Sequence, residues 1–330
     1  MRVGVVGLGS MGQAHVRVFS EIADLVGVAD PNPEAGMAVS NRFSTSYFPD
    51  HRSLLRENLD AVSVCAPTHL HFAIASDVVA AGLNVLVEKP MCDNVRDAQR
   101  LTDAARKAGV TLAVGHIERH NPVVDHAKRA LEAGEYGTLI TVSARRVSSF
   151  PDRVRDVGVI QDLGIHEFSV LQHLVGAPVK SVFAVGGQQK HASFEDHATV
   201  LLQYESGVTG VVEVNWLTPM KVRRLALTCS KNFVELDYQA QSVTISSAAL
   251  LAYDPANLYQ APFEYDVRQV LLKKEEPLRR ELLDFLEAIK LGRDPKVTGE
   301  EACETLAVVD AAVRSQRSGQ VAHLTSAEST

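Results

Sequence analysis

A glycine-rich turn between a short strand and a helix constrains this sequence more than any other feature. The Val-rich run Val3 to Val6 leads directly into Gly7-Leu8-Gly9-Ser10-Met11-Gly12, and Gln13 to Ser20 has helical character. In a Rossmann unit the first glycine allows the tight turn, the second lets the backbone approach a pyrophosphate, and the third lets the helix pack on the strand. The phosphates then lie at the helix N-terminus. The segment therefore predicts a dinucleotide site with contacts from Gly7, Gly9, Ser10, Met11 and Gly12.

The second predicted strand ends in an acidic residue. Leu25 to Ala29 is apolar, and Asp30 follows eighteen residues after Gly12. A carboxylate at this place accepts hydrogen bonds from both hydroxyls of the adenosine ribose, and its charge repels a 2′-phosphate. Asp30 therefore favours NAD over NADP. The alternative is an Asp that only forms the turn before Pro31.

Strand and helix signals then alternate. Ala61 to Ala66 is apolar, Phe72 to Ala81 is helical, Asn84 to Val87 is a strand and Val95 to Lys107 is helical. This is the βαβ pattern of a parallel sheet, whose ligands lie at the carboxyl ends of its strands. The residues that we expect at the cofactor after the first of these strands are Ala66, Pro67, Thr68 and His71.

Two histidines in that turn raise the question of a metal site. His69 and His71 lie two residues apart, but no cysteine or carboxylate nearby completes a ligand set. We interpret the segment as a turn with a helix-orienting histidine and predict no metal.

The strand Asn84 to Val87 is followed by Glu88-Lys89-Pro90. A lysine at the carboxyl end of a strand lies beside a bound nicotinamide, where its ammonium group can polarise a hydroxyl or carbonyl oxygen. Glu88 and Lys89 are therefore candidate cofactor-binding residues, and Lys89 is also a candidate catalytic residue.

A second candidate pair lies beyond the first domain. Asp162 and His166 fall in a predicted helix from Gln161 to about Val175, four residues apart, so that they share one face of that helix. His166 can move a proton while Asp162 orients it or balances its charge. The alternative is a capping Asp followed by an unrelated core histidine.

The rest of the chain predicts a second, α+β domain. After a crossover loop and helix within His116 to Gly134, strand patterns recur with turn glycines between them, which is typical of a largely antiparallel sheet. The expected strands are Leu139 to Arg146, Ser181 to Val185, Ala198 to Tyr204, Val208 to Trp216, Leu225 to Cys229, Phe233 to Tyr238 and Ser242 to Ser246, and the expected helices Leu278 to Ile289 and Glu300 to Val313. The fold class is α/β: a Rossmann domain over residues 1–120, and over residues 121–330 an α+β domain whose last helices can pack back on the first.

Composition excludes several classes of partner. A formal charge of -7 disfavours binding to nucleic acid or to an anionic membrane. The four cysteines have no zinc or disulfide spacing, and no apolar run is long enough for a membrane helix. We expect a cytoplasmic protein.

The glycine fingerprint, Asp30, Glu88-Lys89-Pro90 and Asp162-x-x-x-His166 together resemble the glucose-fructose oxidoreductase / inositol dehydrogenase / MocA family over nearly the whole chain. The resemblance implies a nicotinamide cofactor, catalysis by Lys89 and His166 with Asp162 beside them, and an open sheet that forms a homodimer or homotetramer. Gly115 to Arg119 resembles the family's hinge strand. This implies cofactor contacts for His116 and Arg119, although His116 stands where an aromatic residue is common.

Three further segments resemble family members that act on C3 of UDP-N-acetylglucosamine: Arg145 to Val147, Phe150 to Gly158 and Asn215 to Pro219. A nucleotide-sugar pyrophosphate needs cationic donors, and this acidic chain has a local group of them. The alternative is solvent-facing arginines paired with surface acids. The group is Arg145, Arg146, Arg153, Arg155, Lys221, Arg223 and Arg224, of which Arg146, Arg153 and Arg155 are, with Lys89, Asp162 and His166, the candidate substrate-binding residues.

These expectations define an NAD-dependent oxidoreductase that acts on a CH–OH group of a small sugar substrate. Three alternatives remain: a dehydrogenase for inositol or a free sugar, which needs no arginine cluster; a non-catalytic NAD-binding redox sensor, which needs no Lys89, Asp162 and His166 together; and a metal-dependent hydrolase that uses the histidines.

Overall fold

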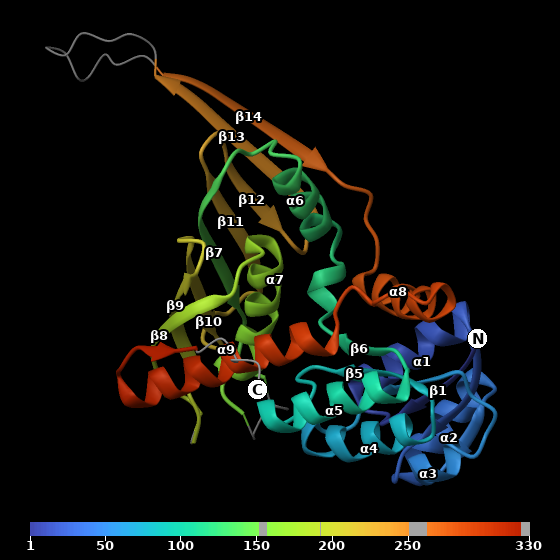
Figure 1. Ribbon diagram of the computed structural model, residues 1–330. Helices are drawn as coiled ribbons and strands as arrows, with labels where there is room; N and C mark the ends of the chain where they lie inside the picture. Colours follow the sequence, from blue (N-terminus) through green and yellow to red (C-terminus); the bar gives the residue numbers. More distant parts are fainter. Residues whose placement is uncertain (152–156, 192, 251–262, 325–330) are drawn as a thin grey trace, which may run out of the picture. The chain divides into compact units, whose positions relative to one another are not determined.

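The structure, a computed structural model, describes residues 1–151, 157–191, 193–250 and 263–324 (Figure 1). The chain divides into two compact units. Unit 1 consists of Met1–His120 and Glu275–Ala307, and unit 2 consists of Asn121–Lys274 and Val308–Thr330. A segment near the carboxyl end of the chain therefore belongs to the same unit as the glycine turn.

Unit 1 is built on a six-stranded sheet in which all paired strands are parallel. The strand order is β3-β2-β1-β4-β5-β6. The first half of the sheet extends from β1 in one direction, and the second half extends from β4 in the other. This is the switch point at which doubly wound sheets bind ligands. The strands are β1 (Arg2–Val6), β2 (Asp24–Ala29), β3 (Ser46–Phe48), β4 (Ala61–Val64), β5 (Asn84–Glu88) and β6 (Leu112–Gly115).

Helices cover both faces of this sheet because its strands are apolar on both sides. Helix α1 (Ser10–Ile22) and helix α8 (Pro277–Leu291) pack against one face with Phe19 and Phe285. Helix α4 (Thr68–Ala80) and helix α5 (Val95–Ala108) pack against the other with Val78 and Leu101. The remaining elements of unit 1 are α2 (Pro33–Phe43), α3 (His51–Leu54), the 3-10 turn η1 (Ile117–His120) and the first part of α9 (Gly299–Ser318).

Unit 2 is built on a nine-stranded sheet in the order β14-β13-β12-β11-β7-β10-β9-β8-β15. Every paired neighbour is antiparallel except β7 and β10, which are parallel. The strands are β7 (Leu139–Val147), β8 (Val179–Gly187), β9 (His197–Tyr204), β10 (Thr209–Asn215), β11 (Val222–Cys229), β12 (Phe233–Asp237), β13 (Ser242–Leu250), β14 (Phe263–Leu271) and β15 (Ala322–His323).

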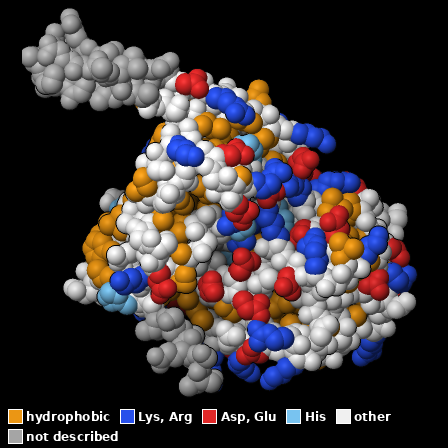
Figure 2. Space-filling model, turned by 45° about the horizontal axis from the view of Figure 1, so that its top comes forward, with side chains coloured by type: hydrophobic (Ala, Val, Ile, Leu, Met, Phe, Trp, Pro, Cys, Tyr) orange, Lys and Arg blue, Asp and Glu red, His pale blue; other side chains and the backbone are white. Residues whose placement is uncertain are grey.

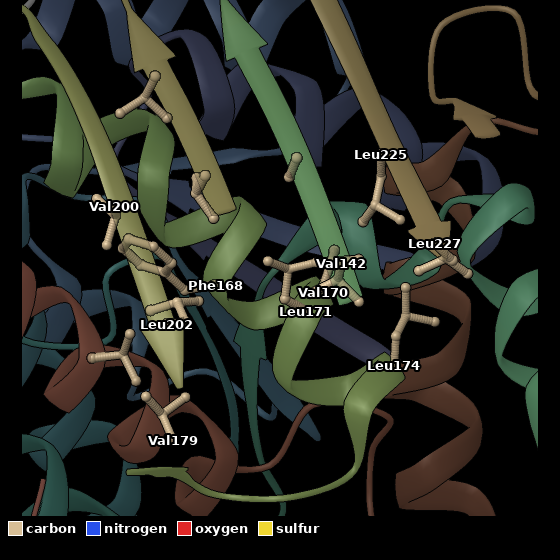
Figure 3. Close-up of a cluster of buried hydrophobic side chains, with 14 of the residues drawn as sticks. Val142, Phe168, Val170, Leu171, Leu174, Val179, Val200, Leu202, Leu225 and Leu227 are labelled. Atoms are coloured by element: carbon tan, nitrogen blue, oxygen red, sulfur yellow. The ribbon is translucent and has the colours of Figure 1, made fainter. Parts of the chain in front are cut away.

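Helices cover one face of this sheet. Figure 3 shows Phe168, Leu171 and Leu174 of α7 (Ile165–Val175) lying against side chains of the strands, among them Val142 and Leu202. Helix α6 (Pro122–Glu132) and the last part of α9 add Val123 and Val309 to the same core.

The expected fold class is confirmed, and the structure adds elements that the sequence patterns did not reveal. The helix α2, the short strand β3 and the strand β14 were not expected. The helix expected from Gln161 begins instead as a π-helical turn, η2 (Ile160–Gly164), which continues into α7. None of the helices within the described ranges has the length and apolarity that crossing a bilayer requires.

Candidate active site

The residues predicted to contact a cofactor in unit 1 gather at one edge of the parallel sheet. Strand register pairs Val6 with Ala29 on one side and with Val64 on the other, and Val64 with Val87. The residues that follow these four positions are Gly7, Asp30, Cys65 and Glu88, so they come at the same carboxyl edge.

The glycine turn has the shape that a pyrophosphate requires. Gly7 has a φ of +88°, and a Cβ atom there would lie 2.6 Å from the Ala66 nitrogen. A Cβ on Gly12 would lie 1.8 Å from the Gly7 carbonyl oxygen, so only glycine lets α1 start this close to β1. A Cβ on Gly9 would meet nothing within 4 Å.

The N-terminus of α1 next to this turn is open to an anion. Gly9 supplies no capping side chain, and the first turn, which contains Ser10 and Met11, has no acidic residue. Unpaired backbone N–H groups and the helix dipole favour negative charge at such a site. These residues therefore fit the diphosphate of a dinucleotide.

Asp30 lies directly beside the glycine turn. Its Oδ2 accepts a hydrogen bond of 2.7 Å from the Leu8 N–H, and its Oδ1 accepts one of 2.8 Å from the Asn32 N–H. The second bond is the turn-forming role of the alternative interpretation. Each carboxylate oxygen can accept further bonds, so both roles are compatible.

The turn after β4 is attached to the turn after β5. His69 is exposed, whereas His71 is buried. The His71 Nε2 atom lies 2.7 Å from the Ala66 carbonyl oxygen, and its Nδ1 atom lies 2.9 Å from that of Pro90. Pro67 and Thr68 lie at the start of α4, which has no side-chain cap at its N-terminus. His71 therefore orients two main-chain turns of the predicted cofactor edge.

Lys89 is half-buried at the end of β5, and its N–H donates a 3.1 Å hydrogen bond to Oε2 of Glu88. His116, which follows β6, is buried. Burial, and then the charges of Arg119 and Lys89, lower the pKa of His116 to about 3. A neutral imidazole therefore lies near the Lys89 ammonium group.

Arg119 forms hydrogen bonds with the carboxyl-terminal segment of unit 1. The buried guanidinium donates to the Lys296 carbonyl oxygen at 3.2 Å and to Glu301 Oε1 at 3.0 Å. These bonds attach η1 to Lys296 and to α9 within unit 1.

In unit 2, Asp162 and His166 stand on consecutive helical turns, and both are half-buried. Asp162 belongs to the π-helical turn η2 and His166 to the first turn of α7. The Glu195 carboxylate, itself buried, accepts from the Ile160 N–H at 3.1 Å and so fixes the start of η2. Single π turns occur frequently at functional sites.

The structure divides the predicted arginine group between the two faces of the sheet. Arg145 and Arg146 are neighbours on β7, so their side chains point to opposite faces. Arg145 is exposed and pairs with Glu213 at 2.9 Å, whereas the Nε atom of buried Arg146 donates to Glu167 at 2.5 Å. The expectation of one basic site was therefore wrong for these two residues. Figure 2 shows acidic side chains beside basic ones over much of the visible face.

The other four arginines of the group have different outcomes. Arg224 is exposed and lies 3.5 Å from Asp237, which is the surface pairing of the alternative interpretation. The Cα partner of Arg223 is Arg146, which places Arg223 on the helix-covered face. Arg153 and Arg155 lie outside the described residues.

Three buried polar residues of unit 1 were not predicted from the sequence, and they lie close to the carboxyl edge of its parallel sheet. His15, Ser63 and Glu281 are 0%, 0% and 2% exposed. Both His15 and Glu281 lie at i, i+3, i+4 spacing with apolar residues of the buried helix face, and a polar residue in such a stripe is a signal that the sequence contained.

Comparison with known proteins gives matches in both units. Residues 1–116 match the family described as "Oxidoreductase family, NAD-binding Rossmann fold", and residues 124–235 match the "GFO/IDH/MocA C-terminal domain". UDP-N-acetylglucosamine 3-dehydrogenase of Acidithiobacillus ferrooxidans is 30% identical over 295 residues, which cover 89% of this chain and 90% of that protein. Myo-inositol 2-dehydrogenase of Thermotoga maritima is 27% identical over 329 residues, which cover 96% of each.

A solved structure of the Acidithiobacillus ferrooxidans UDP-N-acetylglucosamine 3-dehydrogenase is similar over almost the whole chain. It superposes with a TM-score of 0.88 at 29% sequence identity and covers 96% of this chain and 98% of that one.

Proposed function

Because the chain belongs to the Gfo/Idh/MocA family of oxidoreductases, which act on CH–OH groups, we propose that it oxidises the C3 hydroxyl of UDP-N-acetylglucosamine to a ketone with NAD. One observation carries the choice of substrate: a UDP-N-acetylglucosamine 3-dehydrogenase aligns with 89% of the chain at 30% identity. The competing substrate is an inositol, because an inositol dehydrogenase aligns over 96% of the chain at 27% identity.

Two residues carry the proton chemistry in this proposal. His166 takes the proton of the substrate hydroxyl, and the Lys89 ammonium group stabilises the oxygen as it becomes an alkoxide. Asp162, one helical turn before His166, orients the imidazole and stabilises its protonated form. The bound nicotinamide supplies the hydride acceptor.

The residues of unit 1 support NAD as the cofactor. The glycine turn and the uncapped N-terminus of α1 would hold the diphosphate. Asp30 would accept hydrogen bonds from the adenosine ribose, and its negative charge disfavours the 2′-phosphate of NADP. His116 and Arg119 would complete the cofactor side from the segment after β6.

A substrate panel tests the proposal directly. The purified protein with NAD is offered UDP-N-acetylglucosamine, its uronic-acid derivative, myo-inositol and free sugars, and NADH absorbance is followed. A 3-keto nucleotide sugar identified by mass spectrometry is the expected product. Turnover of inositol alone would identify inositol, and not the nucleotide sugar, as the substrate. Tight NAD binding without reduction of NAD by any sugar would favour a redox sensor.

Variants test the residue roles. Lys89→Ala and His166→Ala should each reduce kcat by about 10²–10⁴-fold, the usual contribution of a general acid–base group, while NAD binding is retained. Asp162→Asn should have a smaller effect and should shift the pH dependence of kcat. Near-normal turnover by both alanine variants would refute the catalytic assignment.

We also propose that the protein forms a homodimer or homotetramer through the second face of the unit 2 sheet. Leu201, Val211 and Phe233 point away from the helix-covered core and are 47%, 40% and 42% exposed. Exposed large apolar side chains on one sheet face are typical of a protein interface. Light scattering should give a dimer or tetramer mass, and Leu201→Lys should shift it towards the monomer.

A further inference from the structure

A buried polar cluster lies directly behind Lys89 within unit 1. It consists of His15 on α1, Ser63 on β4, Glu88 on β5 and Glu281 on α8, which are 0%, 0%, 6% and 2% exposed. Burying so many polar groups in an otherwise apolar layer is costly unless each has a partner. The contacts of each member therefore indicate what the cluster does.

Three of the four residues form a chain of hydrogen bonds that ends at Lys89. His15 Nδ1 lies 2.9 Å from Ser63 Oγ, and His15 Nε2 lies 3.0 Å from Glu88 Oε1. The other carboxylate oxygen of Glu88 accepts the Lys89 N–H at 3.1 Å. Glu88 is thus held by a side chain at one oxygen and by the main chain of the next residue at the other.

The Glu88 carboxylate packs closely against the neighbouring strand. A Cβ atom on Gly115, in the neighbouring strand β6, would lie 3.0 Å from Glu88 Oε1. On the far side of Lys89, the Pro90 carbonyl oxygen lies 2.9 Å from His71 Nδ1. The main chain that carries Lys89 is therefore fixed on both sides by buried side chains.

Glu281 is different, because neither of its carboxylate oxygens has a hydrogen-bond partner among the described residues. One of its oxygens, one of Glu88 and a ring nitrogen of His15 lie within 4.8 Å of one another. Burial, reinforced by the charge of Glu88, raises the pKa of Glu281 well above its usual value. Burial therefore favours the protonated, neutral form of the Glu281 carboxyl group.

The space between these three atoms can hold either a proton or a metal ion. The His15 Nε2 atom cannot both donate a hydrogen bond to Glu88 and coordinate a cation. The 3.0 Å contact is the geometry of that hydrogen bond. A proton on Glu281 leaves this bond intact, so the geometry favours the proton.

We propose that His15 and Glu88 are positioning residues for Lys89, and that Glu281 completes their cluster as a neutral acid. The proposal rests on the proposed function, in which Lys89 acts on the substrate oxygen. The hydrogen bonds from Ser63 through His15 to Glu88 fix the main chain of Lys89. The position of its ammonium group is then restricted by a fixed backbone. A displacement of about 1 Å at a reacting group can reduce a rate by about 10²-fold.

A double-mutant cycle tests whether Glu88 acts through Lys89. Glu88→Ala should reduce kcat by about 10–100-fold, the effect typical of residues that orient a metal ligand, with the KM for the sugar within about threefold. Glu88→Gln keeps an acceptor for the Lys89 N–H, and its amide can donate to His15 Nε2 once that nitrogen has lost its proton, so it should restore most of the lost rate. In a Lys89→Ala background, Glu88→Ala should change the residual rate less than threefold; a full additive loss there would overturn the proposal.

A stability control separates positioning from loss of folded protein. Leu101→Ala removes a fully buried side chain of α5 and should destabilise unit 1 by about 2–5 kcal/mol. Leu101 makes none of the cluster's contacts, so the kcat per folded molecule should not change. An equal loss of kcat in Leu101→Ala and Glu88→Ala would show that Glu88 acts only on stability.

A structural readout keeps the two proposals distinguishable. In a crystal structure of Glu88→Ala, the Lys89 main chain should be displaced or disordered, and in Glu88→Gln it should be unchanged. An unmoved Lys89 in Glu88→Ala would refute the positioning role even if no sugar is turned over, whereas normal turnover by Lys89→Ala would refute only the proposed function. Stoichiometric metal in the purified protein, lost in His15→Gln, would overturn the neutral-acid role of Glu281.

Discussion

Replacement of Glu281 by glutamine should stabilise the protein relative to the wild type, by an amount that grows as the pH rises. Glu281 is 2% exposed, and neither carboxylate oxygen has a hydrogen-bond partner among the described residues. Burial raises its pKa well above the usual 4.5, the negative charges of Glu88 and Asp284 add to this, and His15 opposes it. In the unfolded chain the same carboxyl ionises near its usual pKa.

The sign and the size of the effect follow from proton linkage. Between the unfolded and the folded pKa, the folded protein holds one proton more than the unfolded chain. The contribution of Glu281 to stability is therefore complete below about pH 4.5 and is lost as the pH rises towards the folded pKa, by about 1.4 kcal/mol per pH unit. Glutamine has nearly the same shape and does not ionise, so the variant lacks this loss.

Thermal and urea unfolding between pH 5.5 and 7.5 measure the difference. Between the unfolded and the folded pKa of Glu281, the free energy of unfolding of Glu281→Gln minus that of the wild type should grow by up to about 1.4 kcal/mol per pH unit, which is about 2–4 °C in Tm. Glu57→Gln, at an exposed acid of the same unit, is the matched control and should give a flat difference. Parallel pH curves for Glu281→Gln and the wild type would refute the reasoning.

Three further substitutions test other parts of the structure. Gly12→Ala should abolish NAD binding in a fluorescence titration, because its Cβ would lie 1.8 Å from the Gly7 carbonyl oxygen; wild-type affinity would contradict this. Asp30→Ser removes the charge that repels a 2′-phosphate, so the ratio of the Kd values for NADP and NAD should fall at least tenfold, about 1.4 kcal/mol, and an unchanged ratio would contradict the ribose assignment. Arg146→Ala leaves Glu167 buried without this partner and should lower the free energy of unfolding by about 3–5 kcal/mol in urea; a loss below 1 kcal/mol with a raised KM would instead favour substrate binding.

The parallel sheet of unit 1 could be predicted because its signals are local. A glycine turn, an acid at the end of β2 and alternating apolar strands and helices each occupy a few consecutive residues. The three-residue strand β3 is too short to show a pattern. The strand β14 has Asp266, Arg268 and Gln269 within it, and it exists because it pairs with β13, a contact that no local pattern reveals.

The arginine group shows a different kind of failure. Adjacent positions on one strand point to opposite faces, so Arg145 and Arg146 could not both have served one ligand once β7 was expected to be a strand. The alternation rule was available from the sequence, and grouping by proximity in the chain overrode it. By contrast, no local pattern indicates the contact of the π-helical turn that carries Asp162, because the Ile160 N–H at its start donates to Glu195, which lies more than thirty residues away.

The site residues at strand ends could be predicted from the sequence, whereas the buried polar residues that contact Glu88 could not. Lys89 and Asp30 follow directly from strand topology, whereas His15, Ser63 and Glu281 meet Glu88 only after four separate elements pack together. A polar residue within an apolar helix stripe identifies a buried polar position. It does not identify the partner, because the partner lies on another element.

The distribution of buried polar groups is itself an argument for function. Within β5, Val85, Leu86 and Val87 are fully buried and apolar, and the strand then ends in buried Glu88. Replacing a buried ion pair by apolar residues is often neutral or stabilising, so stability alone gives no reason to keep His15 and Glu88 together. Polar groups that make folding less favourable are retained where a reacting group must be held, and in unit 1 they lie directly behind Lys89. If Glu281→Gln raises stability while Glu88→Ala lowers kcat, the same cluster will have been shown to reduce stability and to support catalysis.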